Sequence, residues 1–354
     1  MGNVTPQIIG LGASTPVGRN AWSSAAAVRA GICGFCEHPF MIDTAGEPMR
    51  IARAPWLDVA VQGPERYLAL LIPAMEEAFA PLRERIKSSQ FKMGFTLGLP
   101  SPRPGLPDGL GQTLIDAMAF RFQEPAHKQT FNVGHAAGYL AMNKASEMCE
   151  RGILDLCLVA AVDSYLEPET LEWLEANDQI HGAGPQNNAW GFIPGEAAGA
   201  VLVARPDIAT RLRCVVFGEV VSVGIGQETK LIKTDSVCIG EGLTQAFRTA
   251  LKALATEYQI HNVFCDLNGE TYRADEYGLT ALRTKERFRA ATEFVAPADC
   301  WGDVGAASAP LHMILGLVCH RKRYGAGPLS MVWASSESGK RGAAVIRSAE
   351  AGSQ

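Results

Sequence analysis

One pattern of strand, Gly/Ala-rich turn, apolar helix and second strand occurs twice in this chain, and it constrains the fold more than any other feature of the sequence. The first copy spans residues 131–164 and the second spans residues 294–338. In both copies a basic residue and a glycine close the helix before the next strand begins. A supersecondary unit that recurs predicts a duplicated architecture. We therefore expect two similar halves, residues 1–205 and 206–354.

The segments outside the repeat also alternate between strand and helix patterns. Strands are expected at 7–18, 92–100, 197–206, 213–226 (as a pair) and 263–270, and helices at 22–31, 64–82 and 242–258. Stretches rich in glycine and proline at residues 100–111 and 181–191 are expected to be surface loops. Alternation of this kind predicts the α/β class, with mixed or parallel sheets that are covered by helices.

The composition excludes several classes of function. The 354 residues are 47% hydrophobic, which is ordinary for a globular protein, and they carry a net charge of −5. The longest basic run is Arg321-Lys322-Arg323, so we expect no nucleic-acid partner. No apolar stretch reaches the roughly 18 residues of a membrane span, and the N-terminus lacks the basic start and apolar run of a secretory signal. We therefore expect a cytoplasmic protein without a membrane span.

The chain has nine cysteines, which are scattered through the expected strands and helices. An odd number in this arrangement is typical of reduced, buried thiols rather than of a disulfide framework. Cys33 and Cys36 form a single C-x-x-C with His38 nearby, which is weak support for a metal site because there is no second ligand pair. We expect reduced thiols there, with no bound metal and no cofactor. Five others lie in apolar runs and are expected in the core: Cys149, Cys157, Cys265, Cys300 and Cys319.

Three segments resemble motifs of one enzyme family. Residues 10–18 (GLGASTPVG) resemble its opening G-x-G-x-x-T/S-P-x-G, and residues 189–204 resemble its G-F-V-x-G-E-G-A-G-x-x-V-L. Residues 128–165 resemble the strand, sharp turn and long helix that carry its nucleophile. The family is the β-ketoacyl synthases of the thiolase superfamily, and the resemblance extends over nearly the whole chain. It implies a five-layer α-β-α-β-α fold, in which two pseudo-repeated, mixed-sheet halves share a helical layer.

The catalytic positions implied by this resemblance hold other residues in this chain. Ketosynthases use a cysteine at a helix N-terminus, where the helix dipole stabilises the thiolate, together with two histidines that promote decarboxylation of a malonyl thioester. Here His135 takes the place of the cysteine. Asn268 stands where one histidine would be, and Asp303 lies near the place of the other. These three residues form the candidate site, and none of them reproduces the family's chemistry.

The leading hypothesis is a non-catalytic ketosynthase-like protein that acts as a binding or accessory subunit. On this hypothesis His135 fills the space of the lost thiol and is hydrogen-bonded to its neighbours. The resemblance implies two precedents: degenerate thiolase-like proteins that serve as adaptors for type VI secretion effectors, and chain-length-factor subunits that pair with an active ketosynthase. In the family, one of the two histidines lies in a loop with the sequence H-G-T-G-T. The short chain and the loss of this loop favour the adaptor.

An enzymatic alternative uses His135 for acyl transfer or thioester hydrolysis, since imidazole can act as a nucleophile or a general base. Asp303 would then orient the ring, and Asn268 would donate a hydrogen bond to an oxyanion. A helix N-terminus disfavours the cationic form of histidine, so we expect the His135 ring to be neutral.

The resemblance also implies an edge strand that pairs across a two-fold axis, since a bare edge invites aggregation. The expected edge is either residues 128–133 or residues 156–161. We therefore predict a homodimer, or a heterodimer with a ketosynthase-like subunit. An effector or an acyl carrier protein is the further partner that the two precedents imply.

Overall fold

The fold is built on one long, mixed sheet. The computed structural model describes residues 5–83, 91–122, 124–232, 234 and 236–350. Within this part of the chain a nine-stranded sheet has the order β5-β4-β6-β7-β1-β8-β11-β10-β9. The two halves of the sheet meet at β1 and β8, which pair only through Gln7 with Glu219 and Ile8 with Gly218. Because this contact is so short, the sheet consists in effect of two smaller sheets joined at one corner.

The first half of the sheet is mixed. Its strands are β5 (His127–Asn132), β4 (Met93–Leu99), β6 (Leu156–Ser164), β7 (Glu196–Ala204) and β1 (Gln7–Ser14). The strand β4 runs parallel to both β5 and β6, whereas β7 runs antiparallel to both β6 and β1. Every residue of β4, β6 and β7 is buried, as expected for strands that are covered on both faces.

The second half of the sheet is mixed in the same way. Its strands are β8 (Gly218–Gln227), β11 (Lys340–Ser348), β10 (Leu329–Ser335) and β9 (Asn262–Cys265). The strand β11 is antiparallel to β8 and β10, and β10 is parallel to β9. Two mixed sheets of matching design confirm the predicted α/β fold class with its pseudo-repeated sheets.

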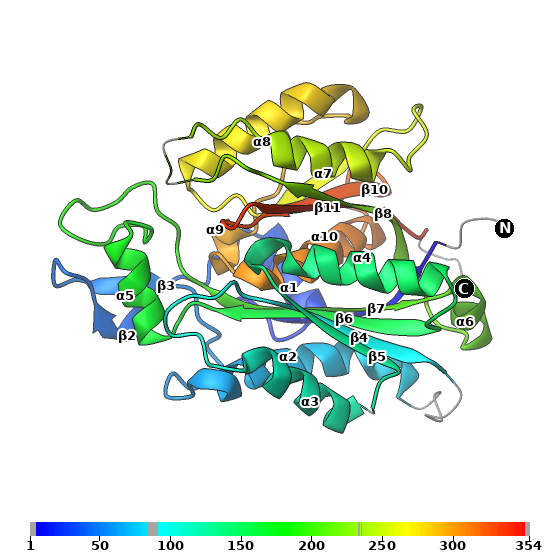
Figure 1. Cartoon of the computed structure of the whole chain (residues 1–354), viewed down its shortest axis with the longest axis horizontal. Coiled ribbons are helices and arrows are strands. Elements are labelled where there is room, and N and C mark those ends of the chain that lie inside the picture. Colours follow the sequence, from blue (N-terminus) through cyan, green and yellow to red (C-terminus); the bar gives the residue numbers. More distant parts are fainter. Residues whose placement is uncertain (1–4, 84–90, 123, 233, 235, 351–354) are drawn as a thin grey trace.

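Helices form three layers around these sheets (Figure 1). The central layer consists of α4 (Ala137–Glu150) and α10 (Ser308–Arg321), the helices of the sequence repeat. The outer layers consist of α2 (Gly63–Phe79) with α3 (Leu110–Phe122), and of α7 (Glu241–Leu251) with α8 (Thr271–Thr284). Layers of helix, sheet, helix, sheet and helix confirm the predicted five-layer architecture.

The two central helices cross closely. A Cβ atom added to Gly138 of α4 would lie 2.7 Å from the Cβ of Ala309 in α10, so the crossing requires a residue without a side chain. All residues from Ser308 to Cys319 in α10 are buried. A helix enclosed between two sheets must be apolar on every side, and this explains why α10 lacks an amphipathic pattern.

Six further helices and strands complete the described part of the chain. They are α1 (Ala21–Arg29), β2 (Cys36–Ile42), β3 (Pro48–Ile51), α5 (Pro168–Ala176), α6 (Pro206–Arg211) and α9 (Ala298–Trp301). Two of them, α1 and α9, pack in the central layer beside α4 and α10. The strands β2 and β3 form a separate hairpin that projects with α5 from one end of the molecule (Figure 1). None of the described helices is long and apolar enough to cross a membrane.

Several sequence predictions are wrong in detail. The expected strand pair at 213–226 is one strand, β8, and the helix expected at 242–258 ends at Leu251. The strand at 156–161 is not an edge, because β6 lies between β4 and β7, whereas the alternative at 128–133 is confirmed by β5. The boundary at Arg205–Pro206 falls between β7 and α6 and stays a prediction.

Candidate functional site

His135 lies in a sharp turn that connects the edge strand β5 to the central helix α4. The turn is a 3-10 segment, Gly134–Ala136, and Gly134 adopts a φ of +74°, a left-handed conformation that favours glycine. The second copy of the repeat has a matching 3-10 segment, Gly305–Ala307, where Gly305 has a φ of +48°. The duplicated turns thus bring the N-terminal ends of α4 and α10 to the same place in the fold.

The structure brings the three predicted site residues together. The Nε2 atom of His135 lies 2.8 and 3.0 Å from the two carboxylate oxygens of Asp303. The amide nitrogen of Asn268 donates a hydrogen bond of 2.6 Å to the same carboxylate. His135 and Asp303 are buried, with exposed fractions of 5% and 4%. The three loops that the resemblance aligned with the family's catalytic loops therefore meet at one point.

A fourth residue, Arg273 of α8, completes the site, and the sequence analysis missed it. Its guanidinium is buried and donates hydrogen bonds to the carboxylates of Asp266 at 2.7 Å and Glu270 at 3.1 Å. Its Nη2 atom lies 3.3 Å from His135 Nε2. The available signal was the spacing of Asp266, Glu270 and Arg273, which puts two acidic residues seven and three positions before a basic residue. We refer to His135, Asp266, Asn268, Glu270, Arg273 and Asp303 as the His135 cluster.

The pKa of His135 shifts in the direction opposite to the expected one. Burial lowers the pKa of the ring, but the Asp303 carboxylate outweighs burial, and the pKa is raised above its ordinary value of 6.5. This direction favours the protonated ring, whereas the sequence analysis expects a neutral one. The reason is that a carboxylate at hydrogen-bonding distance acts more strongly on the ring than the partial charge of a helix end.

The pKa values of two carboxyl groups in the cluster, Asp303 and Asp266, shift in opposite directions. Burial alone would raise the pKa of Asp303, but the ion pair with His135 outweighs it and holds this pKa well below its usual range. Burial raises the pKa of Asp266 even though Arg273 opposes this change. His135 and Asp303 thus form a charged pair, and Asp303 carries its negative charge in the interior.

Asn268 and the start of α4 have their hydrogen-bonding groups occupied by other protein groups, whereas Oδ1 of Asp266 is buried without a hydrogen-bond partner. The Asn268 amide donates to both Asp303 and Glu270, and its oxygen accepts from the backbone N–H of Glu270 at 3.1 Å. The hydroxyl of Ser336 accepts a hydrogen bond of 2.8 Å from the backbone N–H of Ala136. As the amide is arranged here, Asn268 has no N–H group left to donate to an oxyanion, and the start of α4 is capped by Ser336.

A small cavity of about 180 Å³ reaches the cluster from outside. Its lining includes Asn268 and Asp303 together with His181 and Asp299, and among the described residues His135 is not part of it. A molecule in this cavity would contact the amide and the carboxylate before it could contact the imidazole.

The structure also places the other residues that were considered for chemistry. Cys33 is exposed and Cys36 is half-buried. The Nδ1 atom of His38 accepts hydrogen bonds from the backbone of Phe40 and Met41, at 3.2 and 2.9 Å, so it is not free to bind a metal. The five cysteines expected in the core are all buried, which confirms that prediction.

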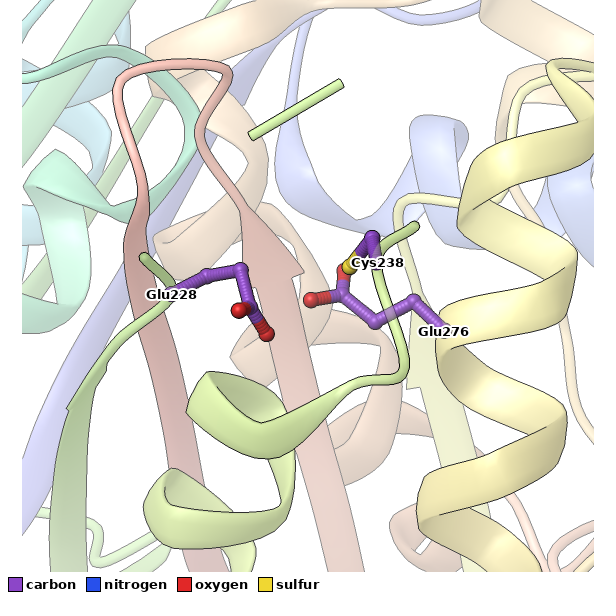
Figure 2. Close-up of side chains that lie close together, drawn as sticks. All are labelled: Glu228, Cys238 and Glu276. Carbon is purple, nitrogen blue, oxygen red and sulfur yellow. The ribbon is translucent and has the colours of Figure 1, made fainter. Parts of the chain in front are cut away.

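A second polar cluster joins β8, the segment before α7, and α8. Figure 2 shows Glu228, Cys238 and Glu276, whose potential ligand atoms all lie within 4.8 Å of one another. Both carboxylates already have partners: Glu276 accepts from Arg341 Nε at 2.5 Å and from a serine hydroxyl, and Glu228 accepts from three backbone N–H groups. The Arg341 guanidinium supplies the positive charge that a metal would supply, so we interpret this cluster as a structural ion pair.

Solved structures with the same fold match almost the whole chain. A ketosynthase complex, described as a type II PKS acyl-carrier protein with its ketosynthase bound to the hexaketide, aligns with a TM-score of 0.81 at 14% identity and covers 98% of this chain and 100% of its own. The ishigamide ketosynthase/chain length factor aligns at 0.80 and 13% identity, with coverages of 98% and 100%. The ketosynthase from module 6 of the bacillaene synthase of Bacillus subtilis 168 aligns at 0.77 and 17% identity, with coverages of 98% and 72%.

Comparison of the sequence with family models and curated proteins finds no relative: no family model matches the chain, and no curated protein matches it. At identities of 13–17%, the match to the solved structures shows a shared fold and nothing finer. The chain therefore has the thiolase-like fold of the ketosynthases.

Proposed function

We propose that this chain is a ketosynthase-fold protein that does not catalyse condensation and instead acts as a binding or accessory subunit. The observation that carries the proposal is the His135 cluster. At the position where the resemblance expects a reactive thiol, an imidazole is ion-paired to Asp303 through its Nε2 atom. Nε2 is committed to Asp303, so this nitrogen is not available as a nucleophile or a base. Because an orienting Asp303 would make the same contact in the enzymatic alternative, it is the absence of a thiol at this position that argues against condensation.

The state of the cysteines supports the same proposal. Condensation requires a thiolate, and thiolates form where positive charge or a helix N-terminus lowers the pKa. Burial instead raises the pKa of Cys149 and Cys319, each to about 12. Burial also raises the pKa of Cys265 and Cys300, the two cysteines closest in sequence to Asn268 and Asp303. None of these four thiols is placed to replace the missing nucleophile.

The enzymatic alternative, acyl transfer or thioester hydrolysis by His135, has less support from this geometry. It requires Asn268 to donate to an oxyanion, and both amide N–H groups are already engaged with carboxylates. It also requires a substrate to reach His135, which does not line the adjacent cavity of about 180 Å³.

A chain-length-factor-like subunit is the second candidate for the binding role. It is favoured by the match to the ishigamide ketosynthase/chain length factor over that whole chain. The strand β5 supports a pairing role, because it is hydrogen-bonded to β4 on one side only and lies at the end of the sheet. An unpaired edge of this kind can continue into the sheet of a second copy or of a ketosynthase-like subunit.

The adaptor role is the third form of the same proposal. An association with type VI secretion effectors stays a prediction that depends on the resemblance alone. An acyl carrier protein as partner has one supporting observation, namely that a matching structure is a complex of a ketosynthase with its acyl-carrier protein.

The proposal is tested by offering the protein the substrates of a condensing enzyme. The full chain is incubated with malonyl and acyl thioesters, and carbon dioxide and free thiol are measured against an active ketosynthase. We expect release no faster than in the absence of protein. Thioester turnover by the wild-type chain that disappears in the His135→Ala variant would overturn the proposal.

A further inference from the structure

A groove of about 530 Å³ lies between α1 and the C-terminal end of α10, away from the His135 cluster. The helix α10 begins at Ser308, close to Asp303, and ends at Arg321, so at ~1.5 Å per residue the two sites are separated by roughly 20 Å. We call this the α1–α10 groove. Its lining residues are Trp22, Ala26, Arg29, Ala30, Val318, Lys322 and Tyr324.

One face of α1 is apolar and exposed. Trp22, Ala26 and Ala30 are all exposed and recur every four residues, which places them on one side of the helix. Ile32, directly beyond this row, is 55% exposed. A surface helix normally directs apolar residues to the core and polar residues to water. The opposite arrangement on this side of α1 indicates a face that a partner covers.

The groove is bordered by positive charge that has no acidic counterpart. Arg29 and Lys322 line it, and Arg321 and Arg323 are the chain neighbours of Lys322. No carboxylate among the described residues lies within ion-pair distance of any of these four cations. This is notable in a chain whose net charge is −5. A local excess of cations beside an apolar strip selects an occupant with acidic and apolar side chains.

The cations are held in place by aromatic rings. Arg29 lies 4.4 Å from the ring centre of Tyr324, and Lys322 lies 5.1 Å from that of Trp22. Burial raises the pKa of Tyr324 to about 12, so its hydroxyl stays neutral and the basic character of the groove is kept.

The length of the apolar row favours a polypeptide as the occupant. From Trp22 to Ala30 the helix rises by roughly 12 Å at ~1.5 Å per residue, and Ile32 extends the exposed apolar surface further. This length corresponds to about two turns of a helix that packs alongside α1. The alanines at the centre and the end of the row, Ala26 and Ala30, let another helix approach closely.

We propose that the α1–α10 groove binds an acidic amphipathic helix of a partner protein. The apolar side chains of that helix pack on Trp22, Ala26 and Ala30, and its carboxylates pair with Arg29 and Lys322. This inference is independent of the proposed function, because it uses none of the residues of the His135 cluster.

The test is a selection with a library of displayed 16-residue peptides on the immobilised full chain. We expect the recovered sequences to carry Asp or Glu around apolar residues spaced three or four apart. The affinity of a recovered peptide, measured by fluorescence anisotropy, should fall at least about tenfold in the double variant Arg29→Glu/Lys322→Glu and should weaken with salt.

A matched control separates this groove from general charge. Arg248 and Lys252 are exposed on or just after α7 and also lack an ion pair among the described residues, so Arg248→Glu/Lys252→Glu changes the net charge equally. The control should bind the peptide as the wild type does. The single variant Ala26→Glu, at an exposed position, should also weaken binding and serves if the double variant does not fold.

Four results would overturn the proposal. They are recovery of no acidic amphipathic sequence, equal loss of affinity in the control, a dimer that Ala26→Glu converts to a monomer, and binding to phosphatidylserine vesicles in place of peptides. The third result would identify a second copy of this chain as the occupant, and the fourth would identify a membrane surface. None of the four would bear on thioester turnover.

Discussion

At the scale of single residues, the His135–Asp303 pair is the feature that separates this protein from a condensing enzyme. We predict that Asp303→Asn lowers the free energy of unfolding by about 3–5 kcal/mol, because it removes one member of a buried, hydrogen-bonded ion pair. Urea denaturation of both proteins measures the difference. Asp299→Asn is the matched control: burial raises the pKa of Asp299 and no ion pair holds it, so this change should be nearly neutral.

The stability contributed by this pair depends on pH in a defined way. The pKa of His135 is raised in the folded protein, so its contribution is complete below the unfolded value of about 6.5 and is lost as the pH rises through the folded pKa. The pKa of Asp303 is lowered, so its contribution is present above about 3.9 and is lost as the pH falls. We predict that the stability difference between wild type and Asp303→Asn is largest near pH 5–6. A difference that keeps growing from pH 6 to pH 9 would contradict this assignment.

The sequence analysis identified His135, Asn268 and Asp303 of the His135 cluster, and it missed Arg273 for a physical reason. His135, Asn268 and Asp303 could be found because each follows a strand or a Gly-rich turn, where the local pattern fixes its place. Arg273 lies in α8, whose polar sequence resembles an exposed segment, and its long side chain reaches His135 only because α8 packs over the end of the second sheet. The neutral state expected for His135 considers the helix end alone and leaves out the Asp303 carboxylate, which lies at hydrogen-bonding distance and raises the pKa of the ring.

At the scale of secondary-structure elements, the crossing of α4 and α10 fixes the position of the His135 turn. We predict that Gly138→Ala destabilises the protein by about 1–3 kcal/mol, because the added methyl group would lie 2.7 Å from Ala309 Cβ and 3.1 Å from the ring of Pro310. The control is Gly278→Ala in α8, where nothing lies within 4 Å of the added Cβ. There the change should stabilise by about 0.5–1 kcal/mol through helix propensity. Equal effects of both changes on the thermal midpoint would show that the crossing is not tightly packed.

The repeat predicted the central elements because strands and helices that are buried on both faces read as continuous apolar runs between Gly-rich turns. The hairpin of β2 and β3 was not predicted, since most of its residues are exposed, β2 has no clear alternation and the alternating strand β3 is only four residues long. The helix at 242–258 was extended too far because the apolar spacing continues past Leu251, where α7 ends. Tertiary contacts, which a local pattern does not contain, decide such boundaries.

At the scale of the whole molecule, the exposed edge of β5 predicts self-association or pairing with a related subunit. The sheet ends at β5 on one side, and in this strand half-buried residues stand beside exposed ones. We predict that light scattering at micromolar concentration gives the mass of a dimer, or that a dimer forms when a ketosynthase-like subunit is added. A strictly monomeric mass under both conditions would contradict the pairing role.

The central claim is that a condensing-enzyme fold here contains a closed ion-pair cluster in place of a nucleophile. Its most direct test is the intact mass of the full chain after incubation with an acyl thioester. The account predicts an unchanged mass for the wild type and for His135→Ala. An acyl adduct on the wild type that is absent from His135→Ala would contradict it.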